Sequence, residues 1–159
     1  MTKNLLTRLN KELKDIEYEL KNTLPKEIAK AAALGDLSEN AEYEAALDRQ
    51  RLLQSKFRTL QSRINDIARL DVSRLPDDRA GYGSIIELYD IDLEKEVTYQ
   101  LVMPEDSDAK VNRISISSPI GKALMGRQED DEFSVDIPSG RKNYEVQSVT
   151  VYSETEMDL

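Results

Sequence analysis

Apolar residues have helical spacing through the first 70 residues of this 159-residue chain, which restricts the folds that the chain can adopt. Apolar residues recur there in alternating steps of three and four, the a/d pattern of a coiled coil. The first seam consists of Leu6, Leu9, Leu13, Ile16 and Leu20. The second seam, with one polar member, consists of Tyr43, Ala46, Gln50, Leu53, Phe57, Leu60, Ile64 and Ile67. The pattern predicts two long helices that pack together.

A very short connection separates the two seams. Gly35 can take the positive φ that closes a helix, and Asp36 can cap the helix that follows. Helices joined by so short a link must run antiparallel, so we expect a coiled-coil hairpin with its tip at residues 35–43, the hairpin tip. The first seam shifts register before Leu24, and Pro25 lies at the shift. An interior proline removes a helix hydrogen bond, which predicts a kink or a break there.

Beyond a polar linker at residues 71–79 the apolar spacing changes to a period of two. Strands are predicted at residues 84–89, 97–103, 113–117, 132–137 and 143–152. A short helix is predicted to start at Ser118-Pro119 and to end at Gly126, and Pro138-Ser139-Gly140 to turn the last two strands. The predicted class is α+β: a hairpin domain at residues 1–75, then a small antiparallel sheet domain with one helix at residues 80–153.

Composition excludes several kinds of chemistry. The chain has no Cys and no His, which removes disulfides, thiol nucleophiles, imidazole bases and the usual zinc ligands. Any metal would be a hard cation bound by oxygen. No apolar run is long enough to span a membrane and no signal peptide opens the chain, so we expect a cytoplasmic protein without membrane contact.

Charge is unevenly distributed along the chain. The net charge is −9; residues 1–70 hold 13 basic and 11 acidic residues, and the remainder holds 9 and 20. This distribution argues against bulk nucleic-acid binding and favours local electrostatic contacts. The most acidic run, Gln-Glu-Asp-Asp-Glu at residues 128–132, is interpreted as a solvated turn.

The hairpin tip, Gly-Asp-Leu-Ser-Glu-Asn-Ala-Glu-Tyr, allows two interpretations. In the first, Asp36 and Glu39 form a capping box, and their negative charge suits the start of a helix. In the second, their spacing of three places two carboxylates on one face of a helix start, at the end of a long arm. Two carboxylates alone bind Mg²⁺ poorly, so the second interpretation requires a partner that already holds the ion.

The nine residues of the hairpin tip closely resemble the tip signature of the GreA/GreB transcript-cleavage factors of bacteria. The resemblance covers nearly the whole chain. Residues 116–124, Ile-Ser-Ser-Pro-Ile-Gly-Lys-Ala-Leu, look like the family's Ser-Pro-Ile segment. The resemblance to this family implies that the second domain is FKBP-like and docks at the mouth of the RNA polymerase secondary channel. The implied docking residues are Ser117, Ser118, Pro119 and Ile120.

The same resemblance implies a role for each residue of the hairpin tip. Asp36 and Glu39 would help to hold a second Mg²⁺ and its water inside the polymerase, which then hydrolyses backtracked RNA near its 3′ end. The chain would be an accessory factor with no cofactor of its own, and a monomer. Leu37, Asn40, Glu42 and Tyr43 would support the tip, although packing in the seam explains Tyr43 equally well.

Five basic residues and no acidic residue occupy the stretch from residue 49 to residue 65; they are Arg49, Arg51, Lys56, Arg58 and Arg63. One interpretation is a contact with extruded RNA phosphates or with acidic channel walls, which the family resemblance supports. The other is a solvated face paired with Glu12, Glu17 and Glu19 across the hairpin. The sequence leaves both open.

Two other functions are compatible with the same architecture. A channel-binding inhibitor would share the fold but lack productive carboxylates, and the intact pair of acids argues against it. A prolyl isomerase is suggested by the FKBP-like domain, but the chain has no Trp and only two Phe. Fold analogy alone does not establish that activity.

Overall fold

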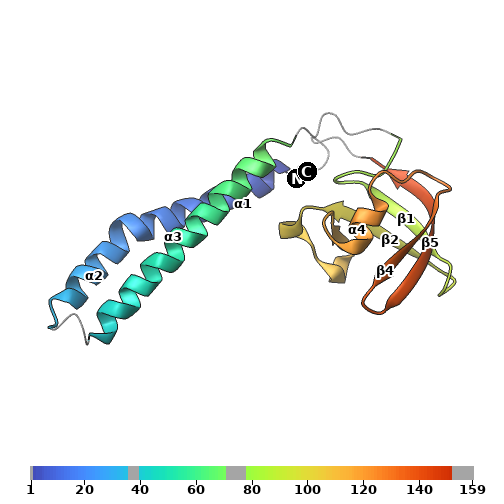
Figure 1. Ribbon diagram of the computed structural model, residues 1–159. Helices are drawn as coiled ribbons and strands as arrows, with labels where there is room; N and C mark the ends of the chain where they lie inside the picture. Colours follow the sequence, from blue (N-terminus) through green and yellow to red (C-terminus); the bar gives the residue numbers. More distant parts are fainter. Residues whose placement is uncertain (1, 36–39, 71–77, 152–159) are drawn as a thin grey trace. The chain divides into compact units, whose positions relative to one another are not determined.

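The computed structural model describes residues 2–35, 40–70 and 78–151. The chain divides into two compact units, Thr2–Leu70 and Asp71–Leu159. The described part of the first unit is helical (Figure 1), with α1 at Thr2–Tyr18, a π-helical turn at Glu19–Thr23, α2 at Leu24–Ala32 and α3 at Ala41–Ala68.

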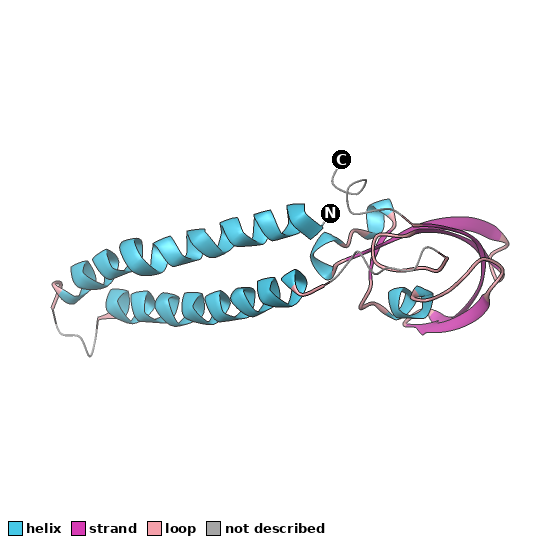
Figure 2. Ribbon diagram, turned by 90° about the horizontal axis from the view of Figure 1, so that it is seen from above, coloured by secondary structure: helices cyan, strands magenta, loops and turns pink. Residues whose placement is uncertain are grey.

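The predicted hairpin is confirmed, because α1 and α2 lie side by side with α3 in both ribbon views (Figures 1 and 2). Five of the buried residues belong to the predicted seams: Leu9, Ile16, Leu53, Ile64 and Ile67. After the register shift, Leu24 and Ala31 are also buried. One seam position differs, since Leu5 is buried while Leu6 is half-buried. At 1.5 Å per residue, the 28 residues of α3 give an arm about 42 Å long.

A π-helical turn, rather than a break, resolves the predicted disturbance at Pro25. The backbone N–H of Leu24 donates to the carbonyl of Glu19, five residues back, whereas Pro25 has no N–H to donate. A π-turn accommodates one extra residue, so Leu24 follows Leu20 by four positions and still faces the seam. Leu24 is fully buried and packs in one cluster with Ile16 and Leu53.

The second unit is built on a five-stranded sheet in the order β3-β2-β1-β5-β4. Its strands are β1 at Ile85–Asp90, β2 at Lys95–Val102, β3 at Arg113–Ser115, β4 at Glu132–Ile137 and β5 at Gly140–Thr150. Neighbouring strands are antiparallel except β2 and β3, which are parallel. The expectation of a wholly antiparallel sheet is therefore corrected at one edge. Two 3-10 turns, Pro104–Asp106 and Ala109–Val111, carry the chain from β2 to β3.

The core of the second unit lies between the curled sheet and helix α4, Pro119–Leu124 (Figure 2). Alternate residues of β1, Ile86 and Leu88, are fully buried and pack in the same cluster as Leu124. The ladder between β1 and β5 shifts register after Glu87. A bulge of this kind increases the local twist and bends the strand.

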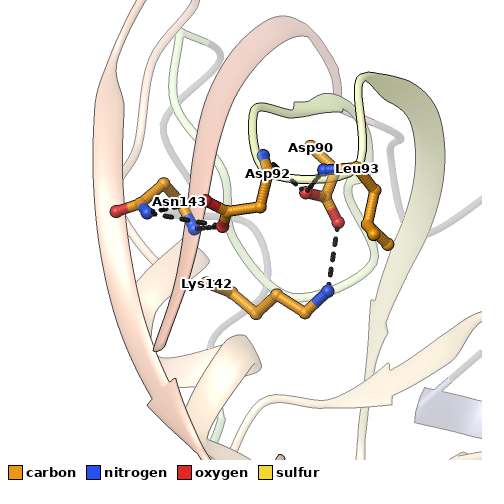
Figure 3. A network of polar contacts seen from close by, with 5 residues as sticks. All are labelled: Asp90, Asp92, Leu93, Lys142 and Asn143. Atoms are coloured by element: carbon orange, nitrogen blue, oxygen red, sulfur yellow. Dashed lines mark hydrogen bonds and ion pairs between the residues drawn. The ribbon is translucent and has the colours of Figure 1, made fainter. Parts of the chain in front are cut away.

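A polar network holds the turn between β1 and β2 against β5 (Figure 3). The Asp90 carboxylate, on a residue only 3% exposed, accepts the backbone N–H of Asp92 at 3.1 Å and of Leu93 at 3.0 Å. It also pairs with Lys142 Nζ at 3.4 Å. The Asp92 carboxylate accepts the backbone N–H of Asn143 at 2.9 Å and its side-chain amide at 3.1 Å. These hydrogen bonds from Asn143 lower the pKa of Asp92.

Candidate functional site

The two helices of the arm are joined through the hairpin tip, of which the structure describes both ends. Helix α2 ends at Ala32, and the next residues fold back with Leu34 N–H donating to the Ala31 carbonyl at 3.1 Å. Gly35 then takes a φ of +139°, which confirms the positive φ expected of this glycine. Leu34, the residue before Gly35, is 63% exposed.

Asn40, rather than Asp36, is the N-cap of α3. Its Oδ1 accepts the backbone N–H of Tyr43 at 3.1 Å, and α3 begins at the next residue, Ala41. The prediction that Asp36 caps the second helix is therefore wrong by four positions. The physical reason is that the Asn40 side chain has a second partner, the Ala31 carbonyl of α2, which favours Asn40 as the cap. The predicted metal ligands Asp36 and Glu39, and the tip residue Leu37, lie outside the described residues.

Asn40 also contacts the other helix. Its Nδ2 donates to the Ala31 carbonyl in the last turn of α2 at 2.6 Å. The amide orientation follows from these partners, because an N–H at Tyr43 requires the oxygen and a carbonyl at Ala31 requires the nitrogen. One side chain thus adds a second donor to the Ala31 carbonyl, which also accepts the Leu34 N–H, and supplies the acceptor for an N–H at the start of α3 that has no partner within that helix.

A cleft of about 390 Å³ lies between α2 and α3 beside this contact. Its lining combines small and charged side chains: Glu27, Lys30, Ala31, Glu42, Ala45, Ala46 and Arg49. Two acids and two bases face the same space, so the lining selects neither an anion nor a cation. Of the residues expected to support the tip, Glu42 is exposed and lines this cleft, whereas Tyr43 is half-buried, as its seam position predicts.

The basic residues of α3 divide into paired and unpaired members. Arg49 forms two hydrogen bonds with the Glu19 carboxylate, at 3.0 and 3.2 Å, which raise the pKa of Arg49. Arg51 pairs with Asp48 on its own helix at 2.7 Å. Arg49 therefore fits the cross-hairpin pairing that the alternative interpretation named.

The remaining members of the stretch differ in exposure. Lys56 and Arg58 are exposed, and neither has an ion-pair partner among the residues that the structure describes. Arg63 is half-buried and makes an interaction of its own. The charge that faces solvent without a fixed acidic partner is thus concentrated at Lys56 and Arg58.

The predicted docking segment forms the start of α4. Ser118 is the N-cap, as predicted: its Oγ accepts the N–H of Gly121 at 3.0 Å and donates to the Ser115 carbonyl at 2.7 Å. Ser117 and Pro119 are exposed. Ile120 is half-buried and packs against the core of the second unit. The segment therefore presents a serine and a proline to solvent, while Ile120 contributes to the core.

Sequence reasoning missed the importance of Gly121. A Cβ at this position would lie 1.9 Å from the Ser115 carbonyl oxygen, so the residue must be glycine for α4 to approach β3 this closely. The available signal was a glycine inside a predicted helix, which is costly unless packing requires it.

The acidic run at residues 128–132 is a turn tied to β5, as the sequence interpretation held. Gln128 N–H donates to the Asp131 carboxylate at 2.9 Å, and Asp130 N–H donates to the Val146 carbonyl at 2.8 Å. Asp130 takes a φ of 71°. Within residues 2–35, 40–70 and 78–151, no cluster of three or more acids has the geometry of a metal site. No helix in those ranges is long and apolar enough to cross a membrane.

Comparison with known proteins gives matches over nearly the whole chain. The family model "Transcription elongation factor, N-terminal" matches residues 1–68, and "Transcription elongation factor, GreA/GreB, C-term" matches residues 75–151. Transcription elongation factor GreA of Trichlorobacter lovleyi is 38% identical over 92% of each chain. The GreA of Anaeromyxobacter sp. strain K is 40% identical over 97% of this chain and 93% of its own. The crystal structure of GreA factor homolog 1 (Gfh1) of Thermus thermophilus is 24% identical and covers 92% of this chain and 94% of its own, with a TM-score of 0.43.

Proposed function

The chain belongs to the GreA/GreB family of transcription elongation factors, and from that membership we propose that it stimulates RNA polymerase to cleave backtracked RNA. In this proposal the helical hairpin enters the secondary channel and brings the hairpin tip to the active centre, near the 3′ end of the RNA. The second unit docks at the channel mouth. The protein acts in the cytoplasm as a monomer.

The observation that supports this proposal most strongly is the capping of α3 by Asn40. The acidic residues Asp36 and Glu39 had a competing explanation as helix caps. Asn40 performs that role, so the N-terminus of α3 does not need them. Capping of α3 therefore does not compete with the proposed metal role of the two carboxylates.

Carboxylate oxygens are the donors that Mg²⁺ prefers, so Asp36 and Glu39 fit the ion that the family resemblance implies. In the two-metal site that such an ion would complete inside the polymerase, one ion would activate water and the other would steady the leaving oxygen. The two carboxylates would contribute ligands and orient that water. They cannot fix Mg²⁺ by themselves, because it requires six ligands. The chain is therefore an accessory factor, and the polymerase performs the hydrolysis.

Two further contacts complete the proposal. Lys56 and Arg58 are the members of the basic stretch best placed to contact RNA phosphates or acidic channel walls, since Arg49 and Arg51 already have acidic partners. Ser117 and Pro119 provide the docking contact with the polymerase, because they are the exposed residues at the start of α4.

The test is RNA cleavage in stalled elongation complexes. Asp36→Asn and Glu39→Gln keep the side-chain shape and remove the charge, so each should reduce stimulated cleavage about 100-fold or more while leaving polymerase binding nearly unchanged. The matched controls are Asp15→Asn and Glu12→Gln, the same changes at exposed positions of α1, and both should retain full activity.

Four outcomes would contradict the proposal. Cleavage that survives both tip substitutions would remove the metal role, and binding that falls in parallel with cleavage would make the acids docking residues. RNA cleavage by the isolated chain in Mg²⁺ would show an independent nuclease. If the unaltered chain binds polymerase but does not raise cleavage, the function is inhibition of the channel.

A further inference from the structure

We propose that Asn40 is a positioning residue for cleavage: its side chain links the end of α2 to the start of α3 and thereby fixes the spacing of the two helix ends, which are joined by the segment that contains Asp36 and Glu39. We call its pair of hydrogen bonds the Asn40 bridge. The inference rests on the proposed function of the two acids, but its structural part can be measured without polymerase.

The Asn40 bridge joins two backbone groups that belong to different helices. Asn40 Nδ2 donates to the Ala31 carbonyl at 2.6 Å, and Asn40 Oδ1 accepts the N–H of Tyr43 at 3.1 Å. Both are part-buried, which shields them from competition with water. Ala31 itself is only 5% exposed and lines the cleft between α2 and α3. The bridge therefore connects the facing sides of the two helices.

Apolar packing contributes little at this end of the arm. Farther from the tip, large side chains hold the helices together, as in the cluster of Ile16, Leu24 and Leu53. Beside the Asn40 bridge the helices are instead separated by the cleft of about 390 Å³, whose lining contains alanines and charged residues but no large apolar side chain. Alanine buries little surface, so it constrains the helix spacing weakly. The hydrogen bonds of Asn40 supply the constraint that leucines supply elsewhere.

The spacing of the helix ends matters because the acids belong to the short segment between them. Residues 36–39 are joined covalently to Gly35 on one side and to Asn40 on the other. A change in the separation of these ends alters the positions open to both carboxylates. Catalytic groups tolerate misplacement poorly, and an error of about 1 Å can cost a large factor in rate.

The two hydrogen bonds of Asn40, one to the Ala31 carbonyl and one from the Tyr43 N–H, can be separated by substitution. Asn40→Ser keeps an N-cap oxygen for Tyr43 but is too short to reach the Ala31 carbonyl. Asn40→Asp also keeps the cap but has no N–H to donate, and its charge repels that carbonyl. The matched control is Asn10→Ser: Asn10 Nδ2 donates to the Leu6 carbonyl at 2.8 Å, the same kind of bond within a single helix.

The first measurement is the width of the arm near the hairpin tip. The chain contains no cysteine, so spin labels can be placed at two exposed positions through Lys30→Cys and Glu44→Cys alone. Electron–electron distances in the full chain should show one narrow distribution. Asn40→Ser and Asn40→Asp should broaden it while helicity stays unchanged by circular dichroism, and Asn10→Ser should leave it narrow.

The second measurement is cleavage in stalled elongation complexes without labels. Asn40→Ser should lower the maximal cleavage rate about tenfold at saturating factor, as loss of a supporting residue does at metal sites. The concentration that gives half-maximal cleavage should not change, because the docking surface is untouched. Asn10→Ser should change neither quantity.

Each alternative result overturns a defined part of the inference. A distribution that stays narrow in both Asn40 variants would show that other contacts set the spacing. A broadened distribution with an unchanged maximal rate would leave a bridge without a positioning role. A parallel loss of rate and affinity would make Asn40 a general structural residue. If Asp36→Asn retains cleavage, the proposed metal role fails, yet the distance measurement still decides whether the bridge exists.

Discussion

One added methyl group at Gly121 should destabilise the second unit, although alanine is normally preferred to glycine inside a helix. Gly121 lies in the first turn of α4. Its Cβ would lie 1.9 Å from the Ser115 carbonyl oxygen and 2.9 Å from the carbonyl carbon. Both atoms belong to the backbone of Ser115, the last residue of β3, so no side-chain rotation can relieve the contact. Helix α4 must move away from the sheet or the Ser118 cap must break.

The magnitude follows from two opposing effects. Alanine gains about 1 kcal/mol over glycine from helix propensity. Overpacking typically costs about 1–3 kcal/mol, and a clash with backbone belongs at the upper end of that range. The net expectation for Gly121→Ala is a loss of about 2 kcal/mol. For a unit of this size 1 kcal/mol corresponds to about 4–8 °C, so its Tm should fall by about 8–16 °C.

The assay is thermal unfolding followed by near-ultraviolet circular dichroism, which reports tyrosine packing in this chain without Trp. Far-ultraviolet measurements follow the helical unit in the same sample and should show its transition unmoved. Lys122→Ala, at the exposed neighbouring position of α4, is the control and should stay within about 0.5 kcal/mol. An unchanged or raised Tm for Gly121→Ala would refute the argument from close approach.

Three other predictions concern the second unit. Burial raises the pKa of the Tyr144 phenol above its ordinary value, so stability is fully present below about pH 10 and is lost as pH rises toward the folded-state value. Phenolate absorbance should show one of the seven tyrosines ionising only as the unit unfolds, and complete titration in the folded state would contradict this. Asp90→Ala leaves two part-buried N–H groups without their acceptor and should cost about 1–2 kcal/mol by denaturant unfolding. Asp136→Ala, on the exposed side of β4, should be nearly neutral, and equal effects of the two changes would mean that the network in Figure 3 contributes nothing. Pro119→Ala should weaken polymerase binding in a pull-down while Tm moves little, and the reverse result would assign this residue to folding rather than docking.

Local sequence patterns predicted the helical hairpin because the apolar spacing that indicates it is repeated many times. Each seam supplies many residues at steps of three and four, so a single ambiguous position changes little. The same redundancy located β4, whose bounds agree with the prediction at residues 132–137. Ser118 was found as a cap for a related reason, since a serine before a proline at a helix start has a local mechanism.

The features that sequence did not predict depend on distant contacts. Asp36 and Asn40 are both good N-caps, and the choice between them follows from the Ala31 carbonyl of the other helix. Strand β3 has only three residues, too few for the sequence pattern to indicate whether it pairs in the parallel or the antiparallel direction. The close approach at Gly121 depends on Ser115, and local sequence does not determine where Ser115 lies relative to α4.

The sequence separation of the contacts along the arm has a consequence for the order in which it folds. The Asn40 bridge joins residues nine apart, whereas the ion pair of Arg49 with Glu19 joins residues 30 apart. Loop-closure entropy, which grows as 1.5RT times the logarithm of loop length, makes the longer closure costlier by about 1 kcal/mol. The two helices of the hairpin are therefore expected to pair first near the hairpin tip and last at the opposite end. Loss of the Asn40 bridge should slow folding, whereas loss of the Glu19 ion pair should mainly speed unfolding, a difference that rapid-mixing kinetics can resolve.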